Sequence, residues 1–157
     1  MNILVNLVAF KTALIPTKKV ELLERINFPS KAENINLAEK LIDELCEKHN
    51  VHEDHYGNIL IAITEAVNNA IHHGNKLDPD KSVTLGYSVD GDKLSVLIAD
   101  EGPGFDFENL PDPTEPENIE KPHGRGVFLM KALADEVEFE QNGAEVEMVF
   151  DLSKKAE

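Results

Sequence analysis

The chain has a single cysteine and only half as many basic residues as acidic ones. Among its 157 residues, 15 are Lys or Arg and 30 are Asp or Glu, so the formal net charge is −15. A surface this acidic disfavours nucleic acid or an anionic membrane as the main partner, but is compatible with a basic protein. Any phosphate ligand must be held by local features, such as a metal ion or a helix N-terminus. Cys46, being alone, excludes an internal disulfide and fits a reducing compartment.

Long hydrophobic runs are also missing. No apolar stretch approaches the ~20 residues that a membrane-spanning helix needs. Residues 1–9 are apolar but lack a preceding basic region and an obvious cleavage site, so we do not expect a signal peptide. We therefore expect a cytoplasmic protein. The length and the hydrophobic fraction of 41% are ordinary for one soluble globular domain.

Hydrophobic periodicity predicts the order β-α-α-β-β-loop-α-β-β, in which the loop is rich in proline. Ser30, with Glu33 three positions later, has the pattern of a capping box and would open the first helix. The order predicts an α/β (α+β) two-layer sandwich, with helices on one face of a mixed, mostly antiparallel sheet. The elements are expected near residues 21–28, 30–45, 53–73, 83–89, 94–99, 124–134, 137–139 and 146–150.

The stretch TEAVNNAIHHGN, from Thr64 to Asn75, lies in the second of these helices and has a distinctive polar face. Glu65 and Asn69 are four residues apart and therefore one turn above one another on the same face. A carboxylate and a carboxamide on a helix that buries its other side are costly unless a ligand uses them. Gly74 is predicted to end the helix. The predicted buried stripe comprises Ile59, Ile63, Ala66 and Ala70.

Two glycine-bearing segments follow at the ends of predicted elements. DEGPG, from Asp100 to Gly104, comes directly after an apolar strand, where a carboxylate suits an exocyclic amine such as adenine N6. The glycines of this segment allow the backbone to approach a flat base closely. HGRG, from His123 to Gly126, opens a helix whose free N–H groups and dipole favour a phosphate.

A single ligand, Mg·ATP, would account for all three segments. Asn69 can offer its carbonyl oxygen to Mg²⁺, which otherwise keeps its waters and the phosphates of the nucleotide. Glu65 can polarise the hydroxyl or water that attacks the γ-phosphate. Each segment alone has an ordinary explanation, such as a solvated helix glutamate or a common turn. The prediction therefore rests on their conjunction in this order.

The three motifs resemble the N, G1 and G2 boxes of the Bergerat-fold (GHKL) ATPases. Within that superfamily, the chain is similar to the small anti-sigma-factor serine/threonine kinases of bacteria, over about residues 26–151. We therefore expect an accessory segment at 1–18 and one ATP-binding kinase domain at 19–153, with an ATP lid at about 107–122. The matching motifs are Glu65-x-x-x-Asn69, Asp100-x-Gly102-x-Gly104 and Gly124-x-Gly126.

The resemblance implies a role for each motif residue. Glu65 would be the general base, Asn69 the Mg²⁺ ligand and Asp100 the adenine contact. His73, four residues after Asn69, would shape the mouth of the nucleotide pocket. The remaining motif residues would line the base and the phosphates: Gly102, Gly104, Gly124 and Gly126.

Two features of this chain differ from the usual pattern of the family. The closing hairpin of the family usually carries Gly-Thr, whereas here Ala144 follows Gly143. We expect the missing hydroxyl to cost ~1 kcal/mol of nucleotide affinity. The basic end of the lid offers three candidates to meet the γ-phosphate, namely Lys121, His123 and Arg125, of which Arg125 is closest to the glycines.

Three functions fit these motifs. The first is a serine/threonine kinase that phosphorylates a protein antagonist and regulates a sigma factor, which is also compatible with a homodimer. The second is a non-catalytic switch whose partner affinity depends on bound nucleotide, and the third is a stand-alone ATPase domain of the histidine-kinase type. Glu65 and Asn69 favour an enzyme, because a switch could dispense with the base. We expect no direct nucleic-acid or membrane partner, and the scattered histidines do not predict a metal site.

Overall fold

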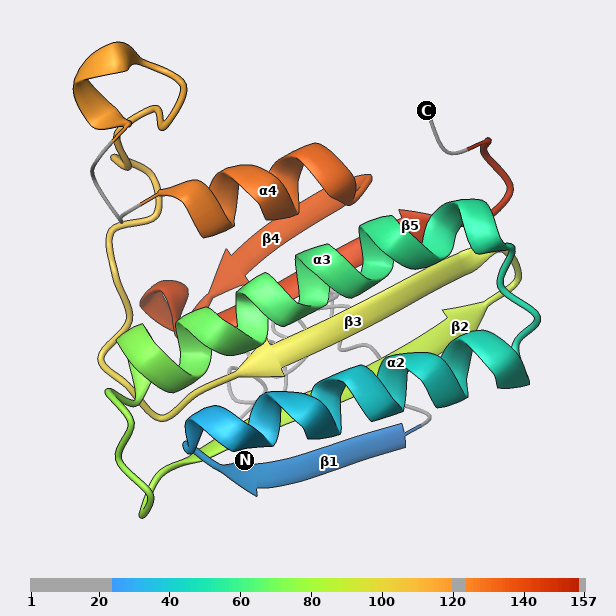
Figure 1. Ribbon diagram of the computed structural model, residues 1–157, viewed down its shortest axis with the longest axis horizontal. Helices are drawn as coiled ribbons and strands as arrows, with labels where there is room; N and C mark the ends of the chain where they lie inside the picture. The colour runs from blue at the N-terminus through green and yellow to red at the C-terminus, as the bar shows by residue number, and fades with distance from the viewer. Residues whose placement is uncertain (1–23, 120–123, 156–157) are drawn as a thin grey trace, which may run out of the picture.

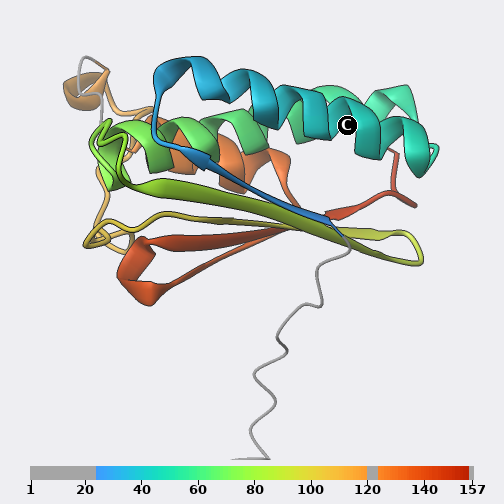
Figure 2. The same cartoon turned by 90° about the horizontal axis from the view of Figure 1, so that it is seen from below.

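The computed structural model describes residues 24–119 and 124–155, and these form two layers. One layer is a five-stranded sheet, and the other consists of helices that all cover the same face of it (Figure 1, Figure 2). The strand order is β1-β2-β3-β5-β4, and each neighbouring pair is antiparallel. The predicted fold class is confirmed, although the described strands are antiparallel throughout rather than mixed. The predicted accessory segment at 1–18 lies outside the described residues.

The elements follow the predicted order along the chain. They are β1 (Glu24–Pro29), α2 (Ile35–Lys48), α3 (Glu53–Asn69), β2 (Ser82–Asp90), β3 (Lys93–Ala99), α4 (Arg125–Leu133), β4 (Glu136–Glu140) and β5 (Glu145–Asp151). Short helical turns lie at Ala32–Asn34, Ala70–Gly74, Pro116–Asn118 and Gln141–Gly143. β1 is an edge strand and β3 is the central strand. Within the described part of the chain, no helix combines the length and the apolar character needed to span a membrane.

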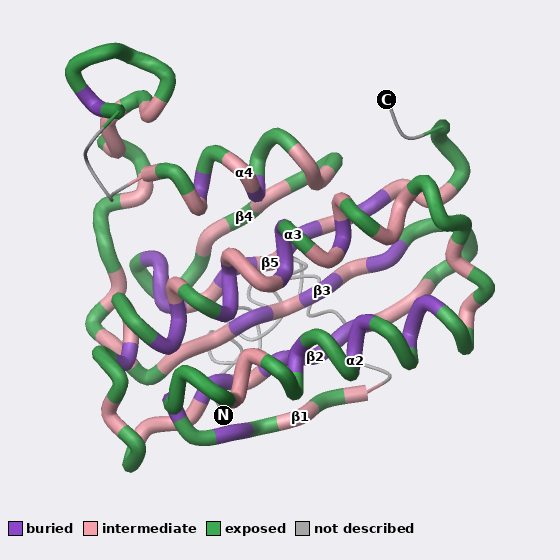
Figure 3. Tube along the Cα trace, in the orientation of Figure 1, coloured by how far each residue is buried: buried purple, intermediate pink, exposed green. Residues whose placement is uncertain are grey.

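The core lies between the sheet and the helices (Figure 3). Alternation along each strand directs every second side chain toward the helices, so Val83, Leu85 and Tyr87 of β2 are almost completely buried. The predicted stripe is confirmed, because Ile59, Ile63 and Ala66 of α3, and Ala70 directly after it, are between 0% and 4% exposed. This burial fixes which face of α3 remains available for polar side chains.

The predicted capping box at Ser30 is wrong. Ser30 is completely buried, and its hydroxyl donates to the Lys81 carbonyl oxygen at 2.9 Å instead of capping a helix. The α-helix begins only at Ile35, and its N-cap residue Asn34 makes no capping bond through its side chain. A buried hydroxyl needs a hydrogen-bond partner, and here a tertiary contact supplies it in place of the local one.

Candidate functional site

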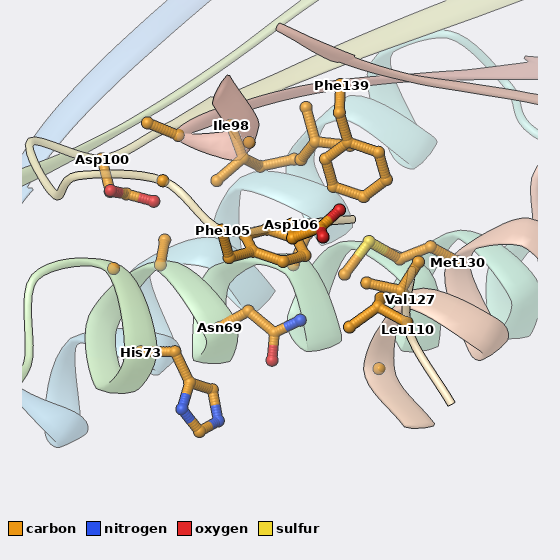
Figure 4. Close-up of a pocket in the computed structure, with 18 of the residues that line it drawn as sticks. Asn69, His73, Ile98, Asp100, Phe105, Asp106, Leu110, Val127, Met130 and Phe139 are labelled. Atoms are coloured by element: carbon orange, nitrogen blue, oxygen red, sulfur yellow. The ribbon is translucent and has the colours of Figure 1, made fainter. Parts of the chain in front are cut away.

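A cavity of about 360 Å³ lies between α3, the end of β3 and the start of α4 (Figure 4). Asp100 lies at one end of this cavity, and Leu110, Val127 and Met130 lie toward the other. Apolar side chains make up much of its wall, with few polar groups among them, which is typical of a ligand site. Motifs that are far apart in the sequence meet here. The predicted site residues that line the cavity are Asn69, His73, Asp100, Gly104, Gly124 and Gly126.

Asp100 is held in place by its own loop and by the β4–β5 hairpin. Its backbone N–H donates to the Ala144 carbonyl oxygen at 2.9 Å, and its Oδ1 accepts the Gly102 N–H at 2.8 Å. Burial raises the pKa of the Asp100 carboxyl above its usual range, and the hydrogen bond from Gly102 opposes this shift. A partly buried carboxylate with one oxygen already bonded can accept a hydrogen bond from a ligand through the other.

Gly74 and Gly102 allow the two loops beside Asp100 to approach each other. α3 continues into a π-helical turn, Ala70–Gly74, a rare conformation that is found frequently at functional sites. A Cβ on Gly74 would overlap the Asp100 carboxylate, and a Cβ on Gly102 would overlap the Gly74 carbonyl oxygen. Gly74 does end the helical segment, but its φ is not left-handed. A glycine is needed at position 74 because the Asp100 carboxylate occupies the space that a side chain would fill. Gly102 does not line the cavity, and instead anchors Asp100.

Glu65 and Asn69 meet the start of α4 at Gly126. A Cβ on Gly126 would lie 2.8 Å from Asn69 Nδ2 and 3.3 Å from Glu65 Oε2. The absence of a side chain at Gly126 therefore lets the N-terminus of α4 pack directly against the polar face of α3. Asn69 lines the cavity, whereas Glu65 lies beside it without lining it. Gly124, with a left-handed φ of 96°, turns the chain into α4.

Two further predicted site residues, His73 and Arg125, lie less centrally. His73 lines the cavity but is exposed, and its ring extends away from Phe105 (Figure 4). Arg125 is exposed and does not line the cavity, and its Nη2 donates to the Ile119 carbonyl oxygen at 3.2 Å. Lys121 and His123 lie outside the described residues.

An aromatic wall on the cavity was missed by the sequence analysis. The Phe105 and Phe139 rings meet edge to face at 5.6 Å, and the Phe107 and Phe139 rings stack at 4.8 Å. The Phe105 N–H donates to the Asn142 carbonyl oxygen at 2.8 Å, which fixes this loop against the hairpin. The only available signal was the pair of phenylalanines directly after DEGPG. The contact of these two rings with Phe139 of β4 depends on tertiary structure, which the sequence does not show.

Asn69 is the one predicted metal ligand, and the structure fits a metal that takes few protein ligands. Among the described residues, no group of three or more His, Cys, Asp or Glu could hold a metal ion. Mg²⁺ binds through one or two protein oxygens together with water and phosphates, and Asn69 Oδ1 can supply one such oxygen.

Comparison with known proteins identifies the family of this chain. A family model described as a histidine kinase-like ATPase domain matches residues 28–150. The chain belongs to this family. The serine-protein kinase RsbW of Bacillus subtilis is 30% identical over 115 residues, which cover 69% of this chain and 72% of that protein. RsbW of Bacillus licheniformis is 28% identical over 134 residues, covering 81% and 84% of the two chains.

The fold also matches a solved structure. A crystal structure of the RsbU and RsbW domains of a Mycobacterium tuberculosis protein aligns with a TM-score of 0.53 and 14% sequence identity. The alignment covers 81% of this chain and 31% of that chain. The likeness supports the fold, and the predicted resemblance to anti-sigma-factor kinases is confirmed at the level of family by the RsbW relatives.

This histidine kinase-like ATPase domain has Ala144 in the wall of its cavity. Ala144 is 8% exposed and accepts the Asp100 N–H through its carbonyl oxygen. The backbone at this position thus retains a structural contact with Asp100. Its methyl side chain adds no hydrogen-bond donor to the cavity.

Proposed function

We propose that this chain is an ATP-dependent serine/threonine protein kinase of the anti-sigma-factor type. The observation that carries the proposal is the placement of two polar groups at separate parts of one cavity. Asp100 lies at one end, which we call the base end. Glu65, Asn69 and Gly126 meet beside the start of α4, which we call the transfer end. The names of the RsbW relatives, serine-protein kinases, support the same activity.

The base end suits adenine. Asp100 Oδ1 is occupied by the Gly102 N–H, so Oδ2 is the oxygen that would accept the exocyclic N6 amine. Ile98, Phe105 and Phe139 provide apolar and aromatic surface against which a flat base can pack. The carboxylate would accept a hydrogen bond from the amine, and the apolar wall would remove the ring from water.

The transfer end suits phosphates. Gly124 and Gly126 line the cavity at the N-terminus of α4, where unpaired backbone N–H groups and the helix dipole attract negative charge. This local device compensates for the acidic net charge of −15. Asn69 Oδ1 would hold Mg²⁺, which when bound neutralises charge on the phosphates. Arg125 is the described cation closest in sequence to these glycines.

Glu65 would act as the general base. Its carboxylate would take the proton of a serine or threonine hydroxyl as that oxygen bonds to the γ-phosphorus and the bond to the bridging oxygen of ADP breaks. Asn69, one turn away on the same face of α3, would supply the protein ligand of the metal. Glu65 is needed for transfer and not for nucleotide binding.

The partners and boundaries follow from the same proposal. The substrate would be a protein antagonist with a target hydroxyl, and a sigma factor would be the regulated partner. The kinase domain would span 19–153 in the cytoplasm, with residues 107–122 as the lid over the nucleotide. Within this range Leu110 lines the cavity, and the Pro111 carbonyl oxygen lies 2.8 Å from where a Cβ on Gly124 would be. These contacts support a lid that is adjacent to the phosphates.

Titration calorimetry of Mg·ATP tests the proposal. We expect wild type to bind in the micromolar range and Asp100→Ala to bind about 10- to 100-fold more weakly, since a hydrogen bond to a charged group contributes about 1.5–3 kcal/mol. The matched control is Asp92→Ala, which removes an exposed carboxylate from the turn at the opposite end of β3 and should bind as wild type does. Equal affinity of Asp100→Ala and wild type, or no binding by wild type at millimolar ATP, contradicts the proposal.

A further inference from the structure

We infer that Asn75 is the positioning residue for Asp100, and that it thereby sets the preference of the site for a 6-aminopurine. This inference rests on the proposed nucleotide-binding function. Asn75 follows the π-helical turn, is 1% exposed, and does not line the cavity. Its backbone N–H donates to the Ala70 carbonyl oxygen at 2.8 Å, which ties it to the end of the helical segment.

The amide of Asn75 joins three separate segments. Its Oδ1 accepts the Glu101 N–H at 2.8 Å, and its Nδ2 donates to Ser30 Oγ at 2.7 Å and to the Ser82 carbonyl oxygen at 3.0 Å. Ser30 Oγ in turn donates to the Lys81 carbonyl oxygen. Both polar atoms of the amide are therefore satisfied, as a buried polar network requires.

The bond to Glu101 acts directly on Asp100. The Glu101 N–H belongs to the peptide that follows Asp100, and the Asp100 N–H, bonded to Ala144, belongs to the peptide that precedes it. Asp100 is thus fixed on both sides by partners from different parts of the fold. Glu101 is held further by its Oε2, which accepts the Ser82 N–H at 2.6 Å.

This double fixation determines where the carboxylate lies. With the backbone held and Oδ1 bonded to Gly102, rotation of the Asp100 side chain is restricted. Among the described residues, Oδ2 accepts no hydrogen bond and so remains available at the cavity. A preorganised acceptor recognises a donor at one position without reorganising on binding. Loss of the Asn75 bond would therefore weaken recognition of the base selectively.

The preference for ATP over inosine triphosphate reports on this positioning. Inosine triphosphate carries a carbonyl oxygen where ATP carries the 6-amino group, so a fixed carboxylate accepts a hydrogen bond from one and repels the other. A site that rejects a ligand through an unpaired polar group discriminates strongly. We expect wild type to favour ATP by about 10-fold or more, and Asn75→Ala to lower that ratio at least about 3-fold, with ATP affinity falling more than inosine triphosphate affinity.

Ser30→Ala is the matched control. It removes a member of the same buried network but leaves the Asn75 bonds to Glu101 and Ser82 in place. We expect Ser30→Ala to lower the unfolding midpoint and to keep the wild-type ratio of ATP to inosine triphosphate affinity. A merely structural role of Asn75 would make the two variants behave alike. Asn75→Leu, which keeps the side-chain shape without polar atoms, takes the place of Asn75→Ala if that variant does not fold.

The outcomes separate the inference from the proposed function. No binding of either nucleotide by wild type overturns the proposed function itself. Binding of both nucleotides with equal affinity by wild type overturns the reading of Asp100 and, with it, the inference. Discrimination by wild type that persists unchanged in the folded Asn75 variant overturns the inference alone. A ratio that falls in the Asn75 variant and not in Ser30→Ala supports it.

Discussion

The base end and the transfer end of the cavity are built in different ways. At the base end, three hydrogen bonds fix Asp100 and the peptides beside it: the Asp100 N–H donates to the Ala144 carbonyl oxygen, the Gly102 N–H donates to Asp100 Oδ1, and the Glu101 N–H donates to Asn75 Oδ1. At the transfer end, the side chains of Glu65 and Asn69 make no hydrogen bond or ion pair with any described residue. Their position comes from the rigid face of α3 and from close packing at Gly126. The base end is thus preorganised, while the polar side chains of Glu65 and Asn69 at the transfer end have no bonded partner among the described residues.

The difference has a physical reason. The Asn75 amide, which holds the peptide after Asp100, lies in a buried network with Ser30, where unsatisfied polar atoms would be costly and a complete network is rigid. Glu65 and Asn69 are half-buried on a helix surface, where water or a ligand can satisfy them. Changes at the base end should therefore alter affinity, and changes at the transfer end should alter transfer.

The largest expected effect is that of Glu65→Gln on phosphotransfer. Loss of a general base lowers rates by about 10²- to 10⁴-fold, and we expect this with unchanged ATP affinity. The measurements are transfer of a labelled γ-phosphate to the protein substrate and, separately, calorimetry. The control is Glu53→Gln, an exposed carboxylate in the first turn of the same helix. Transfer at the wild-type rate by Glu65→Gln would remove this residue from the mechanism.

Gly74→Ala tests whether the base end depends on close backbone packing. The added methyl group would overlap the Asp100 carboxylate and displace it, so we expect ATP affinity to fall about 10-fold or more, as for a lost charge-assisted hydrogen bond. The matched change is Gly57→Ala in α3, where a Cβ meets nothing within 4 Å. This control should raise stability by about 0.5–1 kcal/mol and leave affinity unchanged. Unaltered ATP binding by Gly74→Ala would show that the two loops need not touch.

Asn69→Ala separates metal binding from base recognition. We expect the gain in ATP affinity on adding Mg²⁺ to fall by about 10-fold, since a metal-site contact commonly contributes on this scale. ATP affinity without Mg²⁺ should change little, because the base end is intact. The neighbouring exposed Asn68 provides the control Asn68→Ala. An unchanged Mg²⁺ effect in Asn69→Ala would place the metal ligand elsewhere.

The smallest expected effect is a pH dependence of stability that originates at Asp100. Burial raises the pKa of its carboxyl in the folded chain. The folded state therefore binds the proton more tightly than the unfolded state. The contribution of Asp100 to stability is fully present below the pKa of the unfolded chain and is lost as pH rises through the folded pKa. In urea unfolding of the ligand-free protein, the free energy of wild type minus that of Asp100→Asn should fall across this window. A flat difference would contradict the burial of the charge.

The sequence allowed the fold class and the family to be predicted, both of which are confirmed. Of the residues that it indicated for a nucleotide site, Asn69, Asp100, Gly104, Gly124 and Gly126 line one cavity, and their roles stay predictions. The fold class and the family could be predicted because they depend on local patterns: helical spacing, strand alternation, and glycines next to a polar residue.

What the sequence could not show are contacts between distant segments. Ser30 has the pattern of a helix cap but bonds to Lys81 and Asn75. Gly74 ends the helical segment as predicted, but the sequence does not show that it also makes room for Asp100. Phe139 joins the cavity only because β4 lies next to β5 and its ring meets Phe105. Local propensity does not predict contacts between segments that are far apart in the sequence.

A crystal structure of the protein with Mg²⁺ and a non-hydrolysable ATP analogue is the most direct test of this account. We expect the adenine amine within hydrogen-bond distance of Asp100 Oδ2, with the Asn75–Glu101 bond intact. We also expect the metal on Asn69 Oδ1 and the γ-phosphate beside Glu65. An adenine ring that lies away from Asp100, or phosphates that do not approach the N-terminus of α4, would contradict the account.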